Sequence, residues 1–145
     1  MSRLLIFFAL ALTLFSCQVE EKINTPLQAV PFNAVHLNDC FWAPKIEVNR
    51  TVSIPSAFQK SEETGRVDNF ALAAGLIEGE HQGDFPFDDT DIYKILEGAS
   101  YALAVKYDAK LDNYLDSLIH YIADAQEEDG YLFTCLTNKC DRLKG

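Results

Sequence analysis

The stretch DDTDIYKILEGASYALAVKYDAKLDNYLDSLIHYIADAQ, residues 88–126, decides the fold. Apolar side chains recur three or four positions apart in both halves, the spacing of one face of an α-helix. Residues 107–109 make a short connection, so the two halves predict an antiparallel helical hairpin. Asp88, Asp89 and Asp91 supply capping side chains and negative charge where free amide groups and the helix dipole favour both. Gly130, shortly after the pattern ends near Gln126, predicts a left-handed stop.

The residues before this hairpin predict further helices. A helical pattern begins at Phe41, carries Pro55 as an expected kink, and ends at residues 61–65. A second, shorter helix is expected at residues 67–76. Residues 78–87 contain two glycines and a proline, which is typical of a loop. Residues 35–37 (VHL) could form a short strand, so the expected fold is all-α with one strand-like segment near its N-terminal end.

Residues 1–16 are typical of a secretory signal. Arg3 supplies a positive end and residues 4–15 (LLIFFALALTLF) an apolar core. As a helix this core would reach roughly 18 Å, short of the ~30 Å of hydrocarbon that a membrane-spanning segment crosses. We therefore expect a removable signal rather than a transmembrane helix.

The residues around Cys17 predict a lipid anchor. The stretch LFSC at 14–17 resembles the bacterial lipobox, in which the chain is cut before a cysteine that receives a diacylglycerol group. Several acyl chains on Cys17 would hold the protein stably to a membrane. An ordinary secreted protein is the alternative. Residues 17–30 then form a polar tether, and the expected location is the outer membrane of a Gram-negative bacterium, on its periplasmic or outer face.

Composition excludes two classes of protein. The 145 residues contain 12 Lys and Arg against 22 Asp and Glu, a formal net charge of −10. Nucleic-acid binding needs a basic surface, so no nucleic-acid partner is expected. A hydrophobic content of 48% argues against intrinsic disorder. The length allows one domain at most, at residues 31–145.

Three cysteines remain beyond the lipidation candidate. Cys135 and Cys140 are separated by four residues, a spacing that fits a local disulfide or half of a zinc site. No second half follows, and the three histidines lie far apart in the sequence. Free thiols without a special role, or one local disulfide, are therefore favoured over metal ligands. No metal site is expected in this chain.

Four motifs occur in a specific order: FWAPK at 41–45, GRVDNFALAAG at 65–75, FDDTDIYK at 87–94, and AQ at 125–126 with DGYL at 129–132. Together they resemble the N-terminal part of the β-L-arabinofuranosidase-like glycoside hydrolases, families 127 and 146. The resemblance runs from about residue 31 to residue 134.

The resemblance implies a ring of helical hairpins, the (α/α)6 barrel, of which residues 31–145 are an incomplete N-terminal fragment. It also implies release of L-arabinofuranose from plant glycans with retention, by a cysteine nucleophile held by zinc and a glutamate acid/base. In the family pattern these groups lie downstream of the residues here. No catalytic residue is therefore assigned, and zinc is implied only for the full-length family member.

Five polar residues are candidates for the rim of a sugar pocket in the complete barrel. They are Arg66, Asp68, Asn69, Asp89 and Asp91. Capping and solvation explain the aspartates more simply, and a structural network explains Arg66, Asp68 and Asn69. Two alternatives to an enzyme fragment stay open: a non-catalytic helical lipoprotein that binds glycan or a partner, and an acidic interaction module.

Overall fold

The computed structural model describes residues 27–141. The chain divides into two units, Met1–Pro31 and Phe32–Gly145. Of the first unit, residues 27–31 are described, and they are exposed and outside regular secondary structure. The predicted signal at 1–16 and Cys17 lie outside the described residues.

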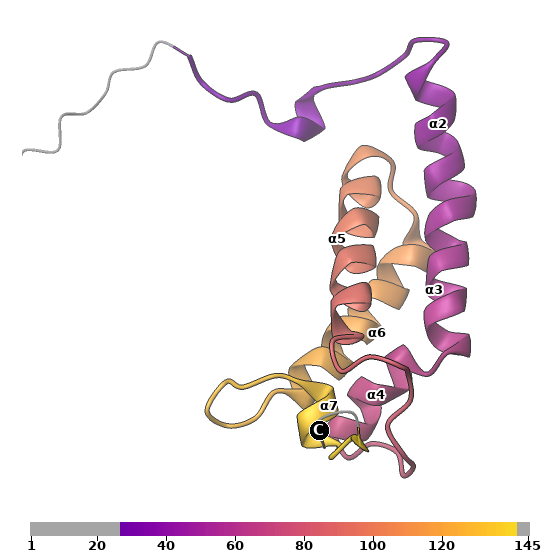
Figure 1. Cartoon of the computed structure of the whole chain (residues 1–145). Helices are drawn as coiled ribbons and strands as arrows, with labels where there is room; N and C mark the ends of the chain where they lie inside the picture. Colours follow the sequence, from indigo (N-terminus) through magenta and orange to yellow (C-terminus); the bar gives the residue numbers. More distant parts are fainter. Residues whose placement is uncertain (1–26, 142–145) are drawn as a thin grey trace, which may run out of the picture. The chain divides into compact units, whose positions relative to one another are not determined.

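The second unit is built from helices (Figure 1). A short 3-10 turn, η1 (Phe32–Ala34), comes first, and the π-helical turn η2 (Asn49–Ser53) lies between α2 and α3. The α-helices are α2 (Trp42–Val48), α3 (Ile54–Glu63), α4 (Arg66–Ala73), α5 (Asp89–Val105), α6 (Ala109–Ala125) and α7 (Thr134–Thr137). Within residues 27–141 there is no strand, so the all-α prediction is confirmed.

The strand expected at residues 35–37 is wrong. Val35 and Leu37 are half exposed, and the segment lies outside regular secondary structure. A strand needs a neighbouring strand to satisfy its backbone groups, and the described part of the chain offers none. The apolar character of this segment therefore misled the prediction.

Helices α2, η2 and α3 follow one another without a break, and the irregularity before Pro55 takes the form of a π-turn. The N–H of Ile54 donates to the carbonyl of Asn49, five residues earlier. Pro55 has no N–H to give to the carbonyl of residue 51, and its ring would collide with that carbonyl in a regular helix. Widening the preceding turn relieves this conflict.

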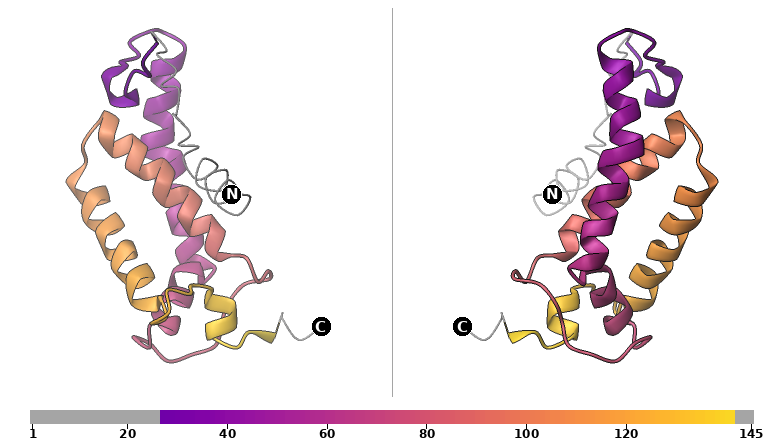
Figure 2. Two further views of the ribbon diagram at one scale, coloured as in Figure 1. Left: turned by 90° about the vertical axis from the view of Figure 1, so that its left-hand side faces the viewer. Right: turned by 90° about the vertical axis from the view of Figure 1, so that its right-hand side faces the viewer.

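The predicted hairpin is confirmed: α5 and α6 run antiparallel beside each other (Figures 1 and 2). The link between them is three residues long, and its last residue, Asp108, begins α6. Its carboxylate accepts hydrogen bonds from the N–H groups of Lys110, at 3.0 Å, and Leu111, at 3.2 Å. Asp108 therefore supplies the capping that a free helix N-terminus needs.

The core lies where these two helices meet α3 and α4. Its apolar members are buried: Ile54, Phe58, Val67, Phe70, Ile92, Ala99, Leu115, Leu118 and Ala125. Tyr114 connects α6 to α3 by two contacts. The centroids of its ring and the Phe58 ring are 4.9 Å apart, and its hydroxyl donates to Glu62 Oε1 at 2.5 Å. Burial, followed by this bond to Glu62, raises the pKa of Tyr114 well above its usual value, so the hydroxyl keeps its proton.

The other predicted boundaries lie close to those observed. The shorter helix expected at 67–76 is α4, and residues 78–87 form the expected loop. Helix α6 ends at Ala125, close to the expected end, and its C-cap residue Gln126 is extended. The predicted left-handed stop is therefore wrong: Gly130, with a φ of 88°, lies in the turn after the helix, where its N–H donates to the carbonyl of Glu127. No helix within residues 27–141 has both the length and the apolar character that crossing a membrane requires.

Two neighbouring positions on α6 test this core. Leu118 is 2% exposed, whereas Ile119 is 47% exposed. We expect Leu118→Ala to lower the free energy of unfolding by about 2–5 kcal/mol, because it removes buried methyl groups and leaves a cavity. Ile119→Ala is the matched control and should cost less than about 1 kcal/mol. Urea unfolding followed by circular dichroism measures both, and equal effects would contradict the observed hairpin.

Candidate functional site

The aspartates at the start of α5 do not cap it, contrary to the prediction. Asp88 occupies the N-cap position, but its side chain accepts no capping hydrogen bond. Asp88 and Asp89 are 3% and 6% exposed, so solvation does not explain them either. Their carboxylates instead bind partners far away in the sequence. Negative charge is still concentrated at the first turn, as the helix dipole favours.

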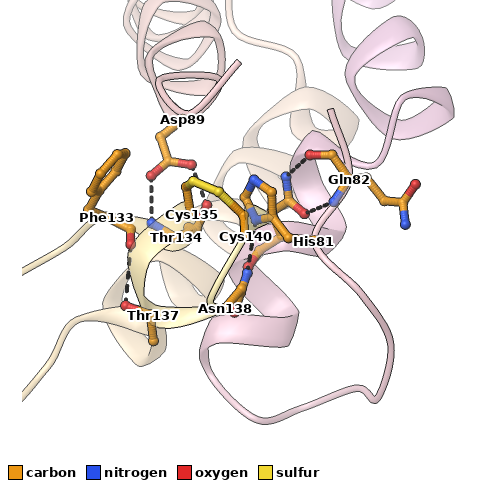
Figure 3. The surroundings of a disulfide bond; sticks show 10 residues. His81, Gln82, Asp89, Phe133, Thr134, Cys135, Thr137, Asn138 and Cys140 are labelled. Atoms are coloured by element: carbon orange, nitrogen blue, oxygen red, sulfur yellow. Dashed lines mark hydrogen bonds between the residues drawn. A yellow bond between two sulfur atoms is a disulfide. The ribbon is translucent and has the colours of Figure 1, made fainter. Parts of the chain in front are cut away.

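Asp89 holds the start of α7. One carboxylate oxygen accepts a hydrogen bond from the N–H of Thr134 at 2.8 Å, and the other accepts one from the Thr134 hydroxyl at 2.5 Å (Figure 3). Both residues are buried. Hydrogen bonds to an ionised acceptor are stronger than neutral ones, and burial makes them costly to break. This pair of bonds, the Asp89–Thr134 clasp, joins α5 to α7.

Arg66, at the first position of α4, holds the other two carboxylates. Its Nε donates to Asp91 Oδ2 at 3.1 Å, and one Nη donates to Asp88 Oδ1 at 3.3 Å. The other Nη donates to the Thr64 hydroxyl at 2.7 Å. The guanidinium therefore ties the turn between α3 and α4 to the start of α5, and it gives the buried Asp88 carboxylate the opposite charge that it needs.

The second oxygen of Asp88 lies against the backbone of Gly83. Gly83 has a φ of 108°, in the region that side chains avoid, and a Cβ there would collide with Asp88 Oδ2. The positive φ and the lack of space for a Cβ each require glycine at this position. The loop before α5 can therefore pass close to the buried carboxylate only because this residue has no side chain.

Asn69 fastens the same loop to α4. Its amide donates to the carbonyl of Gln82 and accepts from the N–H of Gln82, both at 2.8 Å. The Asn69 carbonyl accepts from Asn138 Nδ2 at 2.9 Å, and that nitrogen also contacts His81 Nδ1 at 3.3 Å. Gly65 leaves room for the arrangement, because a Cβ there would collide with the Gln82 side chain. The loop at 78–87 is thus held by side-chain amides.

The five rim candidates therefore have different surroundings. Arg66, Asn69, Asp89 and Asp91 all bind protein partners, so the structural network expected for Arg66 and Asn69 is observed. Asp68 is exposed on α4. Contact with a sugar in the complete barrel stays a prediction for these five residues.

Cys135 and Cys140 form the local disulfide that was one of the expected outcomes, with their Cα atoms 5.0 Å apart. Cys40 is free and exposed. His81 lies beside the disulfide (Figure 3). Burial lowers the pKa of His81, although the negative charges of Asp89 and Asp88 act in the opposite direction and raise it. Sulfurs joined to each other offer no thiolate, so this pair does not fit the zinc-held nucleophile that the family resemblance implies.

Sequence reasoning missed how these groups pair. It placed the Asp run at a helix start, but it did not connect Asp89 with Thr134, 45 residues away, or His81 with the cysteines. One signal was present: Arg66 is the single cation of its motif, and three aspartates follow in the next motif. The excess of aspartates over the single lysine within residues 87–94 favoured a contact with the Arg66 cation.

Comparison with known proteins fits this architecture. Residues 34–144 match the family model described as β-L-arabinofuranosidase, GH127 catalytic domain. The chain therefore belongs to this family of glycoside hydrolases. A non-reducing end β-L-arabinofuranosidase from Bifidobacterium longum subsp. longum is 46% identical over 68 residues, which are 47% of this chain and 10% of that protein.

Two solved structures share the fold. A GH127 β-arabinofuranosidase is 49% identical, with a TM-score of 0.68 over 74% of this chain and 17% of the other. A GH127 β-L-arabinofuranosidase from Geobacillus stearothermophilus T6 is 35% identical, with a TM-score of 0.70 over 75% of this chain and 18% of the other. These neighbours are (α/α)6-barrel enzymes, of which the chain covers part. It spans between a tenth and a fifth of its relatives' length.

Substitution of glycine by alanine tests the contact between Gly83 and Asp88. We expect Gly83→Ala to lower the free energy of unfolding by about 1–3 kcal/mol, because it combines backbone strain with a collision. Gly98→Ala is the matched control: Gly98 lies within α5 with no neighbour within 4 Å of an added Cβ, so alanine should raise stability by about 0.5–1 kcal/mol. Thermal unfolding of the two variants gives the signs, and a neutral Gly83→Ala would contradict the contact.

Proposed function

We propose that this chain forms the N-terminal part of the catalytic barrel of a retaining β-L-arabinofuranosidase that releases L-arabinofuranose from plant glycans. The observation that carries the proposal is the family match over residues 34–144 together with the same helical arrangement in enzymes of 35% and 49% identity. The β-L-arabinofuranosidase activity of those relatives supports the sugar and its anomeric configuration.

In this proposal the described residues build the wall of the barrel rather than perform a chemical step. The hairpin of α5 and α6 supplies one part of the ring, and the contacts of Asp88, Asp89 and Asp91 fix the segments before and after it. Zinc, the nucleophilic cysteine and the acid/base glutamate belong to other parts of the enzyme. No described residue is assigned to the bond-breaking step.

The activity is tested by comparing two proteins. A protein that joins this segment to the rest of a GH127 domain should release the chromophore from an aryl β-L-arabinofuranoside and leave the α-anomer intact. Residues 1–145 alone should release none, because the proposed nucleophile and acid/base lie elsewhere. Absorbance of the released phenol measures both.

Three outcomes decide the matter. Hydrolysis of the β-anomer by the longer protein alone supports the proposal. Hydrolysis by residues 1–145 would show that catalytic groups lie within this chain, and preference of the longer protein for another glycoside would overturn the proposed substrate.

We further propose that Cys17 is lipidated and anchors the protein to the outer membrane. The lipobox-like LFSC sequence and the preceding apolar core support this. In bacteria grown with a labelled fatty acid, the chain should incorporate label and sediment with membranes, and Cys17→Ala should lose both properties. Cys40→Ala is the matched control, because Cys40 is exposed and free. Label that persists in Cys17→Ala would contradict the anchor.

A further inference from the structure

His81, Cys135 and Cys140 bring three metal-binding side chains together beside α7 (Figure 3). One potential ligand atom from each residue lies within 4.8 Å of the other two. His81 comes from the loop before α5, Cys135 is the second residue of α7, and Cys140 lies three residues after the end of that helix. An imidazole nitrogen and two thiolates form a donor set that Zn²⁺ prefers in proteins.

The His81 imidazole is held in place at one ring nitrogen, but its other ring nitrogen has no hydrogen-bond partner among the described residues. Asn138 Nδ2 lies 3.3 Å from His81 Nδ1 and also donates to the Asn69 carbonyl, so the contact is fixed by a second hydrogen bond. The other ring nitrogen, Nε2, is buried and has no hydrogen-bond partner among the described residues. Buried polar atoms nearly always have a partner, and each exception requires an explanation.

The backbone holds the two cysteines together independently of the bond between their sulfurs. The N–H of Cys140 donates to the carbonyl of Cys135 at 2.8 Å, and the N–H of Asn138 donates to the carbonyl of Thr134 at 2.8 Å. The Asp89–Thr134 clasp anchors the start of this turn. The sulfurs would therefore stay close after reduction. Their separation by four residues is also a spacing that zinc sites use.

We propose that reduction of the Cys135–Cys140 disulfide turns this cluster into a Zn²⁺ site whose ligands are the two thiolates and the His81 imidazole. His81 and Cys140 line a cavity of about 570 Å³, through which a metal ion would reach the three side chains. The proposal does not rest on the proposed function.

The site forms in two steps, reduction of the disulfide followed by binding of Zn²⁺. Two molecules of a small thiol reduce the disulfide: its S–S bond breaks, each cysteine gains one electron and one proton, and the two small thiols become one disulfide. Zn²⁺ then displaces the two cysteine protons and forms two Zn–S bonds, while neutral His81 donates a lone pair. A small-molecule disulfide reverses the sequence: it takes two electrons from the two thiolates and becomes two small thiols, while the Cys135–Cys140 bond forms again and Zn²⁺ is released.

Cobalt titration tests the site directly. The full chain carrying Cys17→Ser and Cys40→Ser, which removes the other two thiols, is reduced with a phosphine without oxygen and titrated with Co²⁺. We expect one equivalent to bind, with a thiolate-to-cobalt charge-transfer band that Zn²⁺ abolishes. The same chain with the disulfide intact should show no band. No band after reduction would overturn the proposal.

Two histidine variants separate this site from binding by the cysteine pair alone. His81→Gln should weaken Co²⁺ binding by about tenfold or more, because a ligand is lost. His120→Gln is the matched control, since His120 is exposed and contacts its own helix backbone, and it should bind as the parent does. Circular dichroism follows the fold of each variant. Equal Co²⁺ affinity of His81→Gln and the parent, whether folded or unfolded, would overturn the proposal.

Discussion

The start of α5 depends on two buried carboxylates that must find partners outside their own helix. An ionised carboxylate removed from water is stable only with charges or hydrogen-bond donors directed at it. Asp89 receives two donors from Thr134, and Asp88 receives the guanidinium of Arg66. These contacts connect the turn after α3, the first turn of α5 and the start of α7. Three segments that are distant in sequence are therefore positioned by one short acidic run.

The loop between α4 and α5 is also held by contacts between residues distant in sequence, but here side-chain amides rather than charged groups make the hydrogen bonds. Asn69 pairs with both backbone groups of Gln82, so the loop gains a partner equivalent to a neighbouring peptide group. Asn138 then links the carbonyl of Asn69 to the ring of His81. The apolar core holds the long helices together, whereas polar contacts determine where the connecting segments lie. The disulfide and the histidine are brought together by this second set of contacts.

The sequence predicted the parts of the fold that local physics controls. The spacing of Ile92, Leu115 and Leu118 located the hairpin, because a helical face is determined by neighbours three and four residues apart. Pro55 located the helix irregularity, because its missing N–H acts on the adjacent turn.

Contacts between distant residues could not be read from the sequence in this way. The aspartates were assigned to capping, a local role, whereas their actual partners are up to 45 residues away. Residues 35–37 were assigned to a strand, although a strand depends on a partner that the spacing of one segment does not reveal. The family resemblance was the route by which the sequence indicated a larger barrel, and the match over residues 34–144 supports it.

Hydrogen exchange at the Thr134 amide is the most direct test that the buried acidic run, and not helix capping, organises this part of the molecule. We expect slow exchange at Thr134, comparable with the amide of Leu118 in the core, and fast exchange of Thr134 in Asp89→Asn while Leu118 stays protected. If Thr134 in the unaltered chain exchanges as fast as the exposed amide of Glu128, the Asp89–Thr134 clasp does not hold α7 and the account is contradicted.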